Sequence, residues 1–79
     1  MRSEEIERLI RERLPDASVE VRDYTGEGNH FEAIVVSAAF AGKTRIEQHQ
    51  LVYAALGDAM TGPIHALTLK TLTPEQRQQ

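Results

Sequence analysis

The sequence contains no cysteine among its 79 residues. This absence excludes disulfides, zinc ribbons and thiol nucleophiles, and it means that the chain cannot supply a thiolate to a metal. A chain of this length buries only about 60% of the surface that its unfolded form exposes. We therefore expect one domain over residues 1–79, stabilised by a single apolar core.

Long apolar runs are also absent, since none approaches the roughly 18 residues of a membrane span. Residues 1–5 are mostly charged and no apolar segment follows them, which is unlike a signal peptide and indicates a cytoplasmic protein. The net charge is −3, with acids and bases interspersed. This balance disfavours a surface built mainly to neutralise phosphates, although it leaves room for a local basic patch.

The first half of the chain predicts a helix followed by a hairpin. Apolar residues recur at helical spacing from Ser3, the expected N-cap, to Pro15, which ends the helix. Residues 18–23 alternate between polar and apolar, residues 25–29 are rich in glycine, and residues 30–37 are more continuously apolar. The pattern predicts two antiparallel strands joined by a turn, with the second strand at the centre of a small sheet.

The second half predicts a helix, a strand and a short helix. A long helix is expected over residues 44–60, with Gly62 as its C-cap. Its inner stripe is expected to consist of Ile46, His49, Tyr53, Leu56 and Met60. Residues 64–69 predict a third strand, parallel to the second because a helix connects them, and Thr73-Pro74 predicts a capped helix start. The fold class is therefore α+β, in the order α-β-β-α-β-α, with a three-stranded mixed sheet.

Signatures of enzymes and of nucleic-acid binding are weak. Gly26-Glu27-Gly28 lacks the third glycine of a dinucleotide site, and the hairpin carboxylates are typical of solvated surface, although they could include an acid/base pair. The order of elements resembles the KH arrangement, but the GxxG loop that grips RNA is missing. The basic residues Lys43, Arg45 and Lys70 are scattered along the sequence, which is weak evidence for nucleic-acid binding. The aromatic Phe40 is expected to fill the core rather than to stack on a base.

The three histidines are the strongest candidates for chemistry. His30 begins the second strand and His65 begins the third, so parallel pairing would bring both to the same edge of the sheet. Imidazole is the commonest metal ligand among side chains, but two histidines do not complete a site. His49 is expected to be a hydrogen-bonded residue at the boundary between the long helix and the sheet.

Several segments, in this order and at this spacing, resemble the BolA family. They are GNHF at residues 28–31, IVVS at 34–37, FAGKTRI at 40–46, QHQLVYAAL at 48–56 and IHALTLKTLTP at 64–74. Each segment alone is weak evidence for the resemblance, but together the segments cover most of the chain. The short glycine loop before His30 resembles the IbaG-type branch of that family.

This resemblance implies a BolA-like fold related to the type II KH sheet, and a monothiol (CGFS) glutaredoxin as partner. BolA proteins share a [2Fe–2S] cluster with such glutaredoxins, whose cysteine and bound glutathione supply thiolates, and the isolated chain would hold none. The ligand histidine of the family falls on His65. The second ligand varies within the family, and His30 is the residue nearest to its usual place. Contacts to the partner are expected from Ala66, Lys70 and Thr71.

The resemblance further implies a non-enzymatic adaptor in iron–sulfur cluster trafficking or iron homeostasis. The alternative is a DNA-binding regulator of stress response and cell morphology, a role also attributed to the family. In that case Lys43 and Arg45, at the start of the long helix, would contact DNA.

Overall fold

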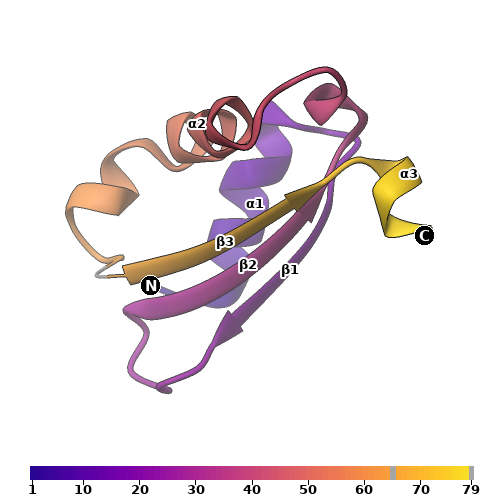
Figure 1. Ribbon diagram of the computed structural model, residues 1–79. Helices are drawn as coiled ribbons and strands as arrows, with labels where there is room; N and C mark the ends of the chain where they lie inside the picture. The colour runs from indigo at the N-terminus through magenta and orange to yellow at the C-terminus, as the bar shows by residue number, and fades with distance from the viewer. Residues whose placement is uncertain (65, 79) are drawn as a thin grey trace.

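A computed structural model describes residues 1–64 and 66–78 and has the predicted order of elements (Figure 1). The α-helices and β-strands are α1 (Ser3–Arg13), β1 (Ser18–Asp23), β2 (His30–Val36), α2 (Arg45–Leu56), β3 (Ala66–Leu72) and α3 (Pro74–Arg77). Two 3-10 turns, η1 (Ala38–Phe40) and η2 (Gly57–Thr61), flank α2. No helix among the described residues is long and apolar enough to span a membrane.

The three strands form one mixed sheet in the order β1-β2-β3. β1 pairs antiparallel with β2, and β2 pairs parallel with β3, which confirms the predicted topology. β3 begins later than predicted and continues to Leu72. Ile64 does not join it, because the Ile64 N–H donates to the Ala59 carbonyl of η2 (3.0 Å) and its side chain is buried.

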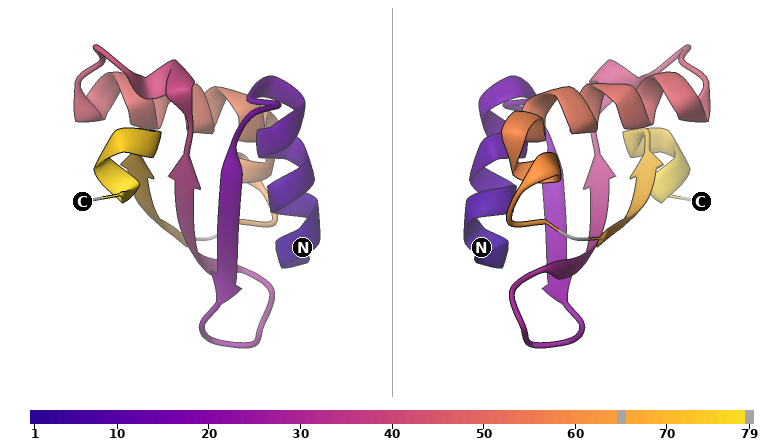
Figure 2. Two further views of the ribbon diagram at one scale, coloured as in Figure 1. Left: turned by 90° about the vertical axis from the view of Figure 1, so that its right-hand side faces the viewer. Right: turned by 90° about the vertical axis from the view of Figure 1, so that its left-hand side faces the viewer.

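The apolar core lies between one face of the sheet and the helices α1 and α2 (Figure 2). Alternate residues of β2 face this core, and Phe31 is fully buried there. α1 contributes Ile6 and Ile10, while Phe40 fills the core from η1, as predicted. The opposite face of the sheet carries exposed residues such as Glu20 and Lys70.

The predicted course of the long helix was wrong in two respects. α2 ends at Leu56 because Gly57 adopts a positive φ of 53° and caps it, so Gly62 is not its C-cap and Met60 lies in η2. The inner stripe is also rotated. Ile46 and Tyr53 are 71% and 39% exposed, whereas the buried residues of α2 are Gln48, Val52 and Leu56.

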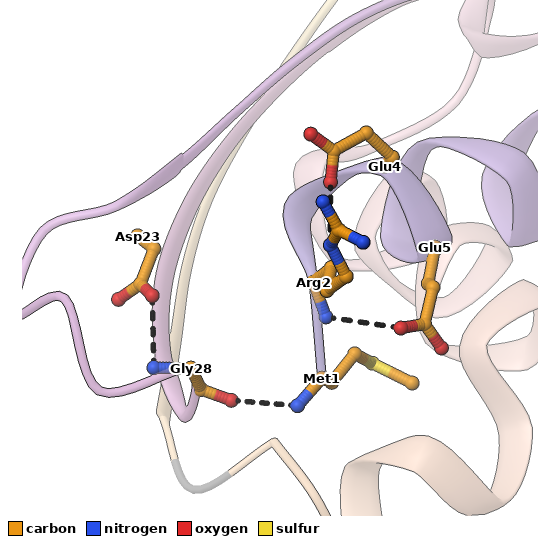
Figure 3. Close-up of polar contacts among 6 residues, drawn as sticks. All are labelled: Met1, Arg2, Glu4, Glu5, Asp23 and Gly28. Carbon is orange, nitrogen blue, oxygen red and sulfur yellow. Dashed lines mark hydrogen bonds and ion pairs between the residues drawn. The ribbon is translucent and has the colours of Figure 1, made fainter.

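The helix starts depend on reciprocal side-chain and backbone hydrogen bonds. Thr44 caps α2 and Thr73 caps α3, each with the residue three positions later, so the predicted start of the last helix is confirmed. α1 begins one residue earlier than predicted. Ser3 is already helical, Arg2 occupies the N-cap position, and the Glu5 carboxylate accepts from the Arg2 N–H at 3.3 Å (Figure 3).

Asp16 joins the α1–β1 connection to the end of β2. Its carboxylate accepts hydrogen bonds from the Ser37 hydroxyl (2.9 and 3.1 Å) and the Ala38 N–H (2.9 Å). These donors, the Ala38 N–H first and the Ser37 hydroxyl second, hold the pKa of Asp16 below its usual value. The Ser37 side chain is almost fully buried, at 1% exposure, so it depends on this partner.

Replacing Asp16 with alanine is expected to lower the free energy of unfolding by about 1–3 kcal/mol near neutral pH, because the buried Ser37 hydroxyl and the Ala38 N–H would both lose their acceptor. Since the pKa of Asp16 is lower in the folded state, its contribution is present above the unfolded pKa of about 3.9 and is lost as the pH falls through the folded pKa. Urea titrations near neutral and in acid should therefore show the difference from wild type shrinking in acid. Asp58→Ala, at an exposed carboxylate in η2, is the control. A difference that stays constant with pH would contradict this account.

Candidate functional site

The N-terminal ends of β2 and β3 lie side by side at the same end of the sheet, where both strands begin (Figure 1). His30 is paired in register with Ala66, and the Asn29 carbonyl accepts a hydrogen bond from the Ala66 N–H (3.1 Å). The backbone arrangement expected from the helical crossover is therefore present. His65 lies outside the described residues, so the separation of the two imidazoles stays a prediction.

The His30 side chain is half-buried and held by its neighbours. Its Nδ1 lies 2.7 Å from Oδ1 of Asn29, and the Tyr24 ring packs against it edge-on, with centroids 6.1 Å apart. An amide oxygen only accepts, so Nδ1 carries the proton in this contact. A metal would therefore bind His30 through Nε2, with Asn29 orienting the ring, as partners of ligating histidines commonly do.

The loop before His30 is organised by the carboxylate of Asp23. It accepts from the N–H groups of Gly26 (3.0 Å) and Gly28 (2.8 Å), both of which adopt a positive φ of 77°. The Gly28 carbonyl accepts from the amino group of Met1 at 3.1 Å (Figure 3). A Cβ at Gly28 would meet the Met1 carbonyl oxygen at 3.1 Å. The loop is thus held from both sides, and it delivers Asn29 and His30 to the start of β2.

Removing the Asn29 side chain is expected to shift the His30 imidazole from the Nδ1–H tautomer towards the Nε2–H tautomer. The reason is that the acceptor facing Nδ1 would be lost. Two-bond ¹⁵N–¹H correlation spectra of the imidazole nitrogens measure this directly. Asn29→Ala is compared with Asn29→Asp, whose carboxylate can only accept and should preserve the Nδ1–H form. The same tautomer in the wild type and in Asn29→Ala would contradict this role of Asn29.

The donor set suits a contributed ligand rather than a complete metal site. Among the described residues, no three His, Cys, Asp or Glu side chains gather closely enough to hold a metal ion. The whole chain lacks cysteine, and [2Fe–2S] clusters are held mainly by thiolates, with imidazole replacing some of them in Rieske centres. The residues therefore fit a cluster only if its thiolates come from another molecule.

A second candidate region lies around the C-terminal half of β3, facing the start of α2. It is a hollow of about 590 Å³ that we call the cationic groove, lined by Lys43, Arg45, Gln48, His49, Leu69, Lys70, Thr71, Leu72 and Gln76. The structure thus brings the predicted DNA-contacting residues, Lys43 and Arg45, together with the predicted partner contacts Lys70 and Thr71. Ala66 lies at the other end of β3, about 13 Å along the strand from Lys70.

Gln48 forms the floor of the cationic groove, a role that the sequence did not reveal. Its Nε2 donates to the carbonyls of Phe40 (3.1 Å) and Lys43 (3.0 Å), and its Oε1 accepts from the Thr71 hydroxyl (2.6 Å). These bonds satisfy a side chain that is only 8% exposed. The four-residue spacing to the buried Val52 was the available signal. His49 is half-buried beside Gln48, with the Tyr53 ring edge-on and 6.4 Å away.

Comparison with known proteins identifies the family. The family described as BolA-like protein matches residues 8–76. The chain belongs to the BolA-like protein family. A Haemophilus influenzae protein is 42% identical over 77 residues, covering 96% of this chain and 87% of that protein. The structure of a BolA protein homologue from Coxiella burnetii superposes with a TM-score of 0.86 at 39% identity, covering 100% of this chain and 99% of that one.

Other BolA-type relatives match a shorter region. The chain is 43% identical over 51 residues to bovine BolA-like protein 1, which is 65% of this chain but only 38% of that protein's length. A second Haemophilus influenzae relative, named DNA-binding transcriptional regulator BolA, is 37% identical over 51 residues, covering 65% of this chain and 50% of that protein. The matches support the BolA family as a whole, and the IbaG-type branch stays a prediction.

Proposed function

We propose that this BolA-like chain is a non-enzymatic adaptor that shares a [2Fe–2S] cluster with a monothiol (CGFS) glutaredoxin and its glutathione. His65 and His30 supply the imidazole ligands, and the complex serves iron–sulfur cluster trafficking or iron homeostasis. The observation that carries the proposal is the pairing of His30 with Ala66, the residue directly after His65. This pairing supports an approach of both histidines at the end of the sheet where β2 and β3 begin.

The chemistry of the donors explains why a partner is needed. A [2Fe–2S] cluster requires four ligands, which are usually thiolates. This chain has no thiolate to give, while a glutaredoxin cysteine and glutathione each have one. A protein that offers imidazole alone stays free of the cluster until a thiol-bearing partner arrives, and this dependence suits an adaptor.

The proposal is tested by titrating a cluster-loaded monothiol glutaredoxin with the chain and recording visible circular dichroism. We expect the cluster bands to change and to saturate near one equivalent, because imidazole coordination alters the asymmetry of the cluster's surroundings. Bovine serum albumin serves as the protein control. An unchanged spectrum at several equivalents would refute a shared cluster.

DNA binding is the second candidate function, and the cationic groove is the observation that favours it. Lys43, Arg45 and Lys70 converge there, and one relative is named as a DNA-binding regulator. Three phosphate contacts would give a salt dependence with a slope of about −2.7 in log affinity against log salt. Duplex binding that persists without salt dependence, or that survives Lys43→Glu/Arg45→Glu, would exclude the groove as the DNA contact.

A further inference from the structure

β3 has one edge that no described strand covers. β3 lies at the end of the strand order and pairs with β2. The Ala66 N–H and the Leu72 carbonyl both bond to the β2 side, to Asn29 (3.1 Å) and Ser37 (3.0 Å). Alternate residues of a strand direct their backbone groups to the same side. The N–H and C=O groups of Leu67, Leu69 and Thr71 therefore point to the open edge.

Cationic side chains stand on both sides of this open edge. Leu69 and Thr71 pair with Ala33 and Val35, which are buried on the helix side of the sheet, so Lys70 projects from the opposite face. Lys43 and Arg45 reach the same groove from the helix side, just before and at the start of α2. An additional strand at this edge would meet positive charge on each of its two faces.

None of these cations forms a close ion pair among the described residues, although Lys43 interacts electrostatically with the Glu47 carboxylate. The ion pairs of the described chain are Arg2–Glu4, Arg8–Glu12 and Arg11–Glu7, all at or within α1. No acidic side chain lines the described part of the cationic groove, although the whole chain has a net charge of −3. Three cations in a groove that no described carboxylate lines favour an anionic ligand at this place.

We propose that the open edge of β3 binds an extended acidic segment of a partner protein as an additional strand. Backbone N–H and C=O groups of the segment pair with Leu69 and Thr71. Neighbouring carboxylates, which point to opposite faces of the added strand, meet Lys70 on one side and Lys43 and Arg45 on the other. This is the strand-addition mode of peptide recognition. It goes beyond the proposed function and does not depend on the cluster.

The geometry favours a peptide over a nucleic acid. Outward N–H groups on alternate residues of β3 repeat at about 6.6 Å, the spacing that another polypeptide strand matches. A DNA duplex carries one charge per about 1.7 Å of axis, far more than three formal cations neutralise. Leu69 and Leu72 add apolar surface to the groove, which a peptide side chain can cover.

The test uses the isolated chain and a capped peptide of about six residues that contains adjacent glutamates among valines. Amide chemical shifts are followed by NMR during titration. We expect saturable binding in which the amides of Leu69 and Thr71 shift more than those of the inward-bonded Thr68 and Lys70. The matching lysine peptide should bind at least about tenfold more weakly, because like charges would meet in the groove.

Two controls separate strand addition from simple charge attraction. The same acidic peptide, N-methylated at every residue, keeps its charge but has no backbone N–H to donate along the edge. It should lose binding, although the protein is unchanged. Lys43→Glu/Lys70→Glu should weaken binding about tenfold or more. The matched reversal Arg13→Glu/Arg22→Glu, at exposed residues outside the groove, should leave it within about twofold. Undiminished binding of the methylated peptide, no binding of the unmodified one, or tighter binding of duplex DNA at the same amides would overturn the proposal.

Discussion

Replacing Phe31 with alanine is expected to lower the free energy of unfolding by about 3–5 kcal/mol. Phe31 is fully buried in the core, in the middle strand of the sheet. Its removal loses transfer free energy and leaves a cavity that the surrounding core side chains fill only partly. A domain of this size has a total stability of about 4–12 kcal/mol, so the variant should lose a large share of it.

Urea denaturation followed by far-ultraviolet circular dichroism measures this loss. Ile46→Ala, at a large aliphatic residue that is 71% exposed, is the control and should change stability by less than about 0.5 kcal/mol. Phe31→Leu should lie between the two. A loss below about 1 kcal/mol for Phe31→Ala would mean that the core is not centred on β2.

Replacing His65 with alanine is expected to abolish the response of the glutaredoxin cluster to this chain. In the proposed complex His65 is the ligand that the family resemblance assigns, and alanine has no donor atom to replace it. His30→Ala should leave a weaker response with an altered spectrum, since one imidazole would be lost and another retained. The measurement is the visible circular dichroism titration described above, made with each variant at equal concentration.

His49→Ala is the matched control for the histidine variants. His49 lines the cationic groove on α2, away from the start of β2. A weaker contact to the partner through the groove would change only the concentration that is needed, so the cluster spectrum at saturation should equal that of the wild type. Far-ultraviolet spectra and melting curves establish that each variant is folded. A folded His65→Ala variant that still changes the cluster spectrum as the wild type does would remove His65 from the ligand set.

Local sequence patterns predicted the elements that depend on local chemistry. The bounds of β1 agree at both ends because polar and apolar residues alternate between Ser18 and Asp23. Thr73 was identified as a cap because Pro74 and Gln76 follow it at the required spacing. The parallel pairing of β2 and β3 followed from the intervening helix, and it placed His30 and the start of β3 at one edge of the sheet.

The sequence-based predictions failed where contacts between residues far apart in the sequence determine the structure. Gly57 and Gly62 are both plausible helix ends in the sequence, and only the packing of η2, in which Ala59 is buried, selects Gly57. Gln48 has the polarity of a surface residue. Only the folded chain shows that its amide group donates to the carbonyls of Phe40 and Lys43. Asn29 could not be recognised as the partner of His30, because that contact depends on side-chain orientation within the loop rather than on residue spacing.

The cationic groove shows how a scattered set of residues becomes a surface. Lys43, Arg45 and Lys70 are separated in the sequence and show no periodic pattern. They converge because α2 starts beside the C-terminal half of β3, where Gln48 links α2 to Thr71. Two predicted roles, DNA contact through Lys43 and Arg45 and glutaredoxin contact through Lys70 and Thr71, therefore compete for one groove.

The most direct test of the central claim, that this chain supplies imidazole to a shared cluster, is pulsed electron paramagnetic resonance. The chain is uniformly labelled with ¹⁵N, mixed with an unlabelled cluster-loaded monothiol glutaredoxin and glutathione, and the cluster is reduced. We predict a strong hyperfine coupling from a directly bound ¹⁵N imidazole, and its loss in His65→Ala. A spectrum without strong ¹⁵N coupling in a complex that has demonstrably formed would contradict the claim.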